Sequence, residues 1–161
     1  MNFKEYLVEV GNSIIKPKKL EIEKKGEETF YKYDINDSAY VTHITTKERP
    51  KKIALEILFY DDSVHAFDRW DKTNKGNALE VVGNTVWCID NHIKTFSPDT
   101  QVFSMHFDGK EEEKGDMRRR DIYLKFVERY LKKNNIKNYE INKTGKVVRV
   151  TFKDVHVKDF K

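Results

Sequence analysis

The sequence predicts one mixed α/β (α+β) domain that spans residues 1–161. A length of 161 residues suits one hydrophobic core of ordinary size and is short for two. Extended segments come first, and two helical patterns then alternate with apolar runs, which favours a mixed class. With 38% hydrophobic, 36% charged and 12% aromatic residues, the composition is that of a globular chain and not of a disordered one.

The first third of the chain is predicted to be a helix followed by an antiparallel meander. Apolar residues recur at helical spacing between Phe3 and Ile15, which indicates a short amphipathic helix. The next three segments are rich in aromatic and β-branched residues and are separated by the turn-like stretches KKGEE and NDS. These predicted strands are Leu20–Glu23, Thr29–Ile35 and Tyr40–Thr46.

A strand, a helix and a second strand are predicted to form the centre of the domain. The run Ile53–Tyr60 is nearly all apolar, which at this length indicates a central strand covered on both faces. Ala78–Phe96 carries an apolar stripe at steps of three and four residues, and Gln101–Phe107 is predicted to be a second core strand. We expect a right-handed crossover that joins two parallel strands.

The C-terminal part is predicted to add a second helix and a closing hairpin. The charged loop DGKEEEKGD leads to Asp116–Lys133, where pairs of apolar residues recur every four positions and Asp116 is a candidate N-cap. The strands Asn138–Ile141 and Lys146–Phe152 flank NKTG, a hairpin turn signal. The expected order is therefore meander, strand, helix, strand, helix and hairpin.

Charge and cysteine content narrow the class of protein. The net charge of +4 comes from 31 basic and 27 acidic residues, a mixed surface unlike that of a dedicated nucleic-acid binder. The lone Cys88 excludes an intramolecular disulfide and favours a reducing compartment. No apolar run approaches the roughly 20 residues of a membrane helix, and the N-terminus lacks a signal-peptide layout. We expect a cytoplasmic protein without a membrane partner.

The stretch DKTNKGNALEVVGNTV, residues 71–86, is the first candidate site. In open α/β sheets, ligands bind beyond the carboxyl ends of strands, where loops lead into helices. A helix N-terminus offers unpaired N–H groups, and a glycine such as Gly76 lets backbone amides approach a phosphate closely. The alternative is that Asn74 or Asn77 only caps the helix while Gly76 turns the chain.

The order of elements and two short motifs resemble the GNAT-type acyl-CoA N-acetyltransferases. That family opens its first crossover helix with Q/R-x-x-G-x-G/A, and this chain has TNKGNA, which matches at Gly76 and Ala78 and departs at Thr73. The family often has L-Y-x-K in its second crossover helix, where this chain has IYLK around Tyr123. Together the two matches cover roughly Ile53 to Ile141.

The resemblance implies a GNAT-like fold and acetyl-CoA as the cofactor. The family inserts its cofactor between two splayed strands, here those bearing Tyr60 and Gln101, and an edge of the first strand pairs with pantetheine. The acceptor implied is an amine on a small molecule or a protein. The residues implied to bind the cofactor are Thr73, Asn74, Lys75, Gly76, Asn77 and Ala78.

Two residues are candidates for the chemistry. The resemblance implies that Tyr123 protonates the departing thiolate of coenzyme A, although its place beside Ile122 on the apolar stripe also fits a core ring. Glu56 is the one carboxylate in IALEILFY. Apolar surroundings tend to raise the pKa of a carboxylate, which would let Glu56 take a proton from an amine near neutral pH. Glu56 can instead point to an edge or pair with a lysine. The histidine spacings predict no metal site.

The chain is also similar to small proteins of tailed bacteriophages, which share a T-x-K/T-G-N/D-A loop and a downstream R-x-x-x-Y helix. This resemblance implies nothing about catalysis and points to the host cytoplasm or the virion. It keeps open a catalytically inactive GNAT-like protein that binds a host or virion protein, or nucleic acid, as a virion component or an inhibitor of host defence.

A basic helix face is the candidate surface for such a partner. Arg118, Arg119 and Arg120 open the second helix and can hold nucleic acid or an acidic protein. Asp121 and Glu128 interrupt the cluster, so a solvated face with locally paired charges is the alternative.

Overall fold

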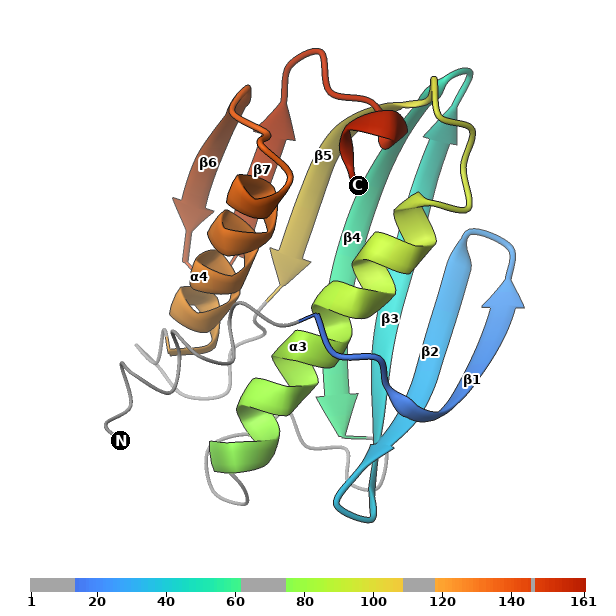
Figure 1. Ribbon diagram of the computed structural model, residues 1–161, viewed down its shortest axis with the longest axis vertical. Coiled ribbons are helices and arrows are strands. Elements are labelled where there is room, and N and C mark those ends of the chain that lie inside the picture. The colour runs from blue at the N-terminus through green and yellow to red at the C-terminus, as the bar shows by residue number, and fades with distance from the viewer. Residues whose placement is uncertain (1–13, 62–74, 109–117, 146) are drawn as a thin grey trace.

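The computed structural model describes residues 14–61, 75–108, 118–145 and 147–161, which form a sheet with helices packed on it (Figure 1). The strands are β1 (Lys18–Lys25), β2 (Glu28–Ile35), β3 (Ser38–Arg49), β4 (Lys52–Asp61), β5 (Gln101–Asp108), β6 (Tyr139–Thr144) and β7 (Val147–Phe152). The helices are α3 (Lys75–Ile93), α4 (Arg118–Lys133) and the short 3-10 helix η2 (Val157–Asp159). The predicted mixed α+β class is confirmed.

The seven strands form one sheet in the order β1-β2-β3-β4-β5-β7-β6. Strands β1 to β4 are an antiparallel meander, β6 and β7 are a hairpin, and β7 pairs antiparallel with β5. Among the described strands, only β4 and β5 pair in parallel, with α3 as the crossover between them. With both strands pointing downward, α3 lies in front of the sheet and β5 to the left of β4, the predicted right-handed crossover (Figure 1).

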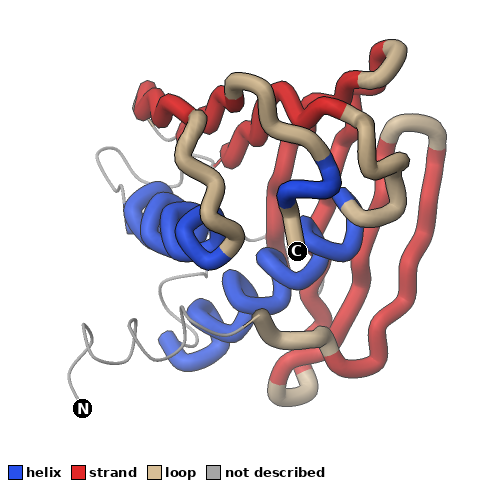
Figure 2. The backbone as a smooth tube through the Cα atoms, turned by 45° about the horizontal axis from the view of Figure 1, so that its top comes forward, coloured by secondary structure: helices blue, strands red, loops and turns tan. Residues whose placement is uncertain are grey.

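Both helices pack on the same face of the sheet (Figure 2). Strand β4 alternates accordingly: Ile53, Leu55, Ile57 and Phe59 are at most 1% exposed and face the helices. Helix α3 adds Val81, Cys88, Ile89 and Ile93 to this core, and helix α4 adds Tyr123, Phe126, Val127 and Leu131. We call this side of the sheet the helix face and the opposite side the open face.

The alternation corrects the prediction that β4 is covered on both faces. Glu56 on the open face is exposed, and its neighbours Ala54 and Leu58 are only partly buried. The apolar run is long enough for a doubly covered strand, but both described helices lie on the other side.

Some predicted boundaries also move. Helix α3 begins at Lys75 and ends at Ile93, after which Thr95 and Phe96 close a tighter turn ahead of Pro98. Thr144 still pairs with Val147, so the C-terminal hairpin closes later than NKTG predicted. The predicted N-terminal helix up to residue 13, most of the DGKEEEKGD loop and the cap Asp116 lie outside the described residues.

Candidate functional site

The predicted phosphate cradle lies at the N-terminus of α3. Because the helix already begins at Lys75, Gly76 and Ala78 belong to its first turn and do not form a loop before it, which corrects that prediction. Thr73 and Asn74 lie outside the described residues, as do the side chains of residues 75–79, Asn77 included. The first turn carries no acidic residue. A helix N-terminus has a partial positive charge that attracts anions.

The pairing between β4 and β5 stops at the end of the strands that is nearest this helix terminus. Their parallel pairing runs from Lys52 with Gln101 to Ile57 with Phe107 and ends there. Strand β4 nevertheless continues to Asp61, while Asp108 at the end of β5 pairs with Val147 of β7. Figure 1 shows the two arrows diverging toward the start of α3. Within the described residues, the pairing of β4 with β5 therefore stops before β4 itself ends.

Tyr123 reaches this point from α4, on the helix face. Its ring centroid lies 4.9 Å from that of Phe59 on β4 and 5.2 Å from that of Phe107 on β5. The side chain is 1% exposed, so the ring is a core element between the two strands where they stop pairing. This is the packing expected of a core tyrosine.

Glu56 lies on the open face, one residue before the last β4–β5 pair. It borders a shallow hollow of about 300 Å³ whose lining residues are His43, Thr45, Glu56, Ile57, Leu58 and His106. Because Tyr123 is on the helix face, the structure does not bring the two predicted catalytic residues onto one side of the sheet. Both residues lie near the last β4–β5 pair, Glu56 on the open face and Tyr123 on the helix face.

Two histidines of the hollow were not predicted as site residues. The Nη2 atom of Arg149 donates a hydrogen bond of 3.3 Å to Nδ1 of His106, so Nδ1 is the acceptor and the proton of the ring is on Nε2. His43 stacks on Phe30 with ring centroids 4.3 Å apart, and its Nε2 lies 3.3 Å from Oε1 of Glu28. Met105 and Phe107 are buried, so His106 between them lies on the open face, and the pairing of β5 with β4 puts it beside Glu56.

The third predicted site, the basic face of α4, begins at the first turn of that helix. The backbone of Arg118, Arg119 and Arg120 is helical, as predicted, and the side chains of these three arginines lie outside the described residues. The basic face therefore stays a prediction.

A buried polar cluster joins α3 to the meander and is separate from the hollow. His92 lies between Tyr31, whose hydroxyl is 2.9 Å from Nδ1, and Thr46, whose hydroxyl is 2.7 Å from Nε2. Burial, helped by the charge of Lys24, lowers the pKa of His92 to about 4, so the ring is neutral. Burial also raises the pKa of the Cys88 thiol, which keeps it protonated and unreactive. The contacts of His92 are those of a residue that stabilises the packing of α3 on the meander.

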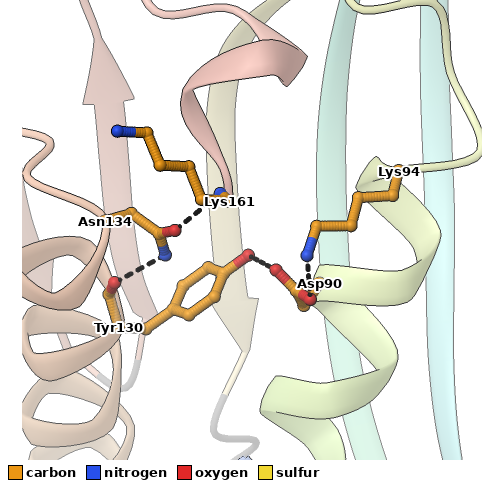
Figure 3. A network of polar contacts seen from close by, with 5 residues as sticks. All are labelled: Asp90, Lys94, Tyr130, Asn134 and Lys161. Carbon is orange, nitrogen blue, oxygen red and sulfur yellow. Dashed lines mark hydrogen bonds and ion pairs between the residues drawn. The ribbon is translucent and has the colours of Figure 1, made fainter.

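A second polar network joins α3 to α4 and to the C-terminal residues (Figure 3). The Tyr130 hydroxyl donates to Oδ1 of Asp90 at 2.7 Å, and Lys94 donates to Oδ2 at 2.8 Å. Burial and the Asp90 charge raise the pKa of Tyr130, so the hydroxyl remains a donor. Asn134 donates to the Tyr130 carbonyl and accepts from the backbone N–H of Lys161. The network joins the two helices to each other and to the C-terminal residues.

Among the described residues, no three His, Cys, Asp or Glu side chains are placed to hold a metal ion. Neither of the long helices in the described part is apolar enough to cross a membrane. Comparisons of the chain with protein-family models, curated proteins and solved structures gave no significant match.

Proposed function

We propose that the chain is a GNAT-like domain that transfers an acyl group from acetyl-CoA to an amine. The observation that carries the proposal is the one parallel pair in an otherwise antiparallel sheet, whose pairing ends at Ile57 and Phe107 while β4 continues. An extended pantetheine arm binds through backbone hydrogen bonds, and in this proposal it lies along the end of β4 beyond the last pair with β5. The strand order and the two helices on one face are compatible with the fold that the resemblance implies.

The N-terminus of α3 supplies the cofactor end of the proposed site. Backbone N–H groups around Gly76 and Ala78 would hold the pyrophosphate, because helix N-termini bind anions through unpaired donors and the helix dipole. In this proposal, Thr73, Asn74, Lys75 and Asn77 complete the cradle around them. A bound pyrophosphate would leave the pantetheine directed toward the nearby end of β4.

Tyr123 and Glu56 supply the proposed proton transfers. Glu56 removes a proton from the acceptor ammonium on the open face, and Tyr123 donates a proton to the coenzyme A thiolate from the helix face. Their opposite positions fit a reaction at the parting of β4 and β5, where leaving group and nucleophile approach from two sides. The amine nitrogen forms a bond to the acyl carbon as the carbon–sulfur bond breaks.

Differential scanning fluorimetry with acetyl-CoA, coenzyme A and a nucleotide-free control tests the proposal. A ligand at a hundredfold excess over its dissociation constant stabilises a protein by about 2.7 kcal/mol, which raises the melting temperature by several degrees. The absence of any shift at millimolar acetyl-CoA and coenzyme A would overturn the enzyme proposal. If binding is seen, a thiol-release assay on Tyr123→Phe, with Tyr139→Phe as the control, tests the proton donor.

One observation favours the alternative of a catalytically inactive GNAT-like protein. Tyr123 is 1% exposed between Phe59 and Phe107, which is the burial of a packing residue. In that case Arg118, Arg119 and Arg120 would bind nucleic acid or an acidic host or virion protein from the cytoplasm or the virion. Fluorescence anisotropy with DNA decides for nucleic acid if binding falls steeply with salt and disappears in the triple alanine variant. Salt-insensitive or absent binding would count against it.

A further inference from the structure

A polar row crosses six of the strands on the open face and has its centre at the hollow. The register pairs each member with the next across neighbouring strands: Glu28, Thr45, Glu56, His106, Arg149 and Asn142. Neighbouring strands lie roughly 4.8 Å apart, so the side chains of Thr45 and His106 flank that of Glu56 closely. A carboxylate is thus held between a hydroxyl and an imidazole.

Two members of this row, Glu28 and His106, have polar side-chain partners, and Glu56 between them has none in the described part of the chain. Arg149 donates to His106, and Glu28 lies within ion-pair distance of His43. Within the described residues, neither a hydrogen bond nor an ion pair reaches the exposed carboxylate of Glu56. The negative charge that faces the hollow is therefore left for a ligand.

The residues that line the hollow determine what the uncharged part of the ligand can be. Leu58 gives an apolar surface on one side, and the imidazole of His43 gives a flat one, held in place by its stack on Phe30. Nε2 of His43 is buried and lies 3.3 Å from Oε1 of Glu28. Charged groups beside the hollow are the Glu56 carboxylate, the Glu28 carboxylate next to His43, and the Arg149 guanidinium, which is directed at His106.

We propose that this hollow binds a compact primary ammonium compound with an aromatic or aliphatic body. The ammonium would pair with Glu56 and donate to Thr45, while the apolar body would lie against Leu58 and the His43 ring. A volume of about 300 Å³ suits a small molecule better than a peptide segment. The inference deepens the proposed function, because Glu56 is the base named there, and it identifies the acceptor as a small amine.

The test is an NMR titration of the full chain with benzylamine, using benzyl alcohol as the neutral probe and benzoate as the anionic one. No acyl-CoA is present, so the result does not depend on cofactor binding. We expect benzylamine alone to shift the amides of Thr45, Leu58 and His106. Equal binding of the alcohol, tighter binding of benzoate, or shifts confined to another surface would overturn the proposal.

A matched pair of variants locates the charge that matters. Glu56→Gln removes the carboxylate from the hollow, and Glu140→Gln removes an exposed carboxylate from the same face on β6. We expect Glu56→Gln to weaken benzylamine binding by about tenfold or more, and Glu140→Gln to leave it unchanged. Equal affinity of wild type and Glu56→Gln would refute the assignment. Benzylamine binding without any acetyl-CoA binding would keep the amine site and refute the transferase.

Discussion

The two faces of the sheet differ in how their polar groups are used. On the helix face, His92, Tyr31 and Thr46 are buried and hydrogen-bonded to one another. On the open face, Glu56 is exposed beside a hollow. Polar groups that satisfy one another inside a core specify the packing of α3 on the meander. Polar groups that remain accessible are the ones available for a ligand. We therefore expect substitutions on the helix face to cost stability and those on the open face to cost binding.

The largest contrast is expected between two leucines of the same strand. Leu55 is 0% exposed under the helices, and Leu58 is only partly buried on the open face. We predict that Leu55→Ala lowers the free energy of unfolding by about 2 to 5 kcal/mol because it leaves a cavity. Leu58→Ala should cost less than about 1.5 kcal/mol, since water already reaches part of the side chain. Urea unfolding measures both, and equal losses would contradict the division between the faces.

The next largest effect is a dependence on pH that comes from His92. Its pKa is about 4 in the folded chain and 6.5 in the reference state. Between these values the unfolded chain binds a proton that the folded chain does not. The free energy of unfolding should therefore fall by about 3 kcal/mol as the pH drops from 6.5 to 4, and be recovered above 6.5.

Other groups also titrate in this range, so the comparison needs a matched variant. His92→Gln keeps a donor and an acceptor near Tyr31 and Thr46 but has no proton to bind. The fall between pH 6.5 and 4, measured by urea unfolding, should be smaller in His92→Gln than in the wild type. Identical slopes in the two proteins would show that His92 does not control this range.

A smaller loss is expected where the two helices meet. Tyr130→Phe removes the hydroxyl that donates to Asp90 but keeps the ring stacked on Phe160. We predict a loss of about 1 to 3 kcal/mol, because the Asp90 carboxylate loses a partly buried donor and keeps only Lys94. Tyr139→Phe, on the edge strand, is the control and should change the melting temperature little. An equal loss in Tyr139→Phe would show that the destabilisation does not come from losing the hydrogen bond to Asp90.

The smallest effect on stability is expected on the open face itself. Glu56→Gln and His106→Gln should each change the free energy of unfolding by no more than about 0.5 kcal/mol, because Glu56 is exposed and water reaches part of His106. A loss of 2 kcal/mol or more would mean that the polar row holds the sheet together, and the open face would then be structural too.

The elements were predictable because each has a local period in the sequence. The alternation of β2 and β3 and the stripe of α3 are read from neighbouring residues, and all three lie within a few positions of their predictions. The prediction that β4 is covered on both faces was wrong, because an apolar run does not show on which side of a strand the helices pack. The start of α3 at Lys75 was missed because the first-turn sequence has no stripe.

The site was less predictable than the fold because it depends on pairing between distant strands. Glu56 was singled out from its strand alone, but its neighbours Thr45 and His106 come from two other strands. A shift of one residue in either register would move those side chains to the helix face. Local sequence therefore indicates which residues face outward, while the register decides which of them meet.

The most direct test of the account is hydrogen–deuterium exchange of the full chain with and without coenzyme A. We predict slower exchange in peptides from the first turn of α3 and from the end of β4 beyond Ile57, where pairing with β5 has stopped. Peptides from β1 and β2, at the far side of the sheet, should exchange at unchanged rates. Unchanged exchange at both α3 and β4 at saturating coenzyme A, or protection confined to β1 and β2, would contradict the proposed cofactor site.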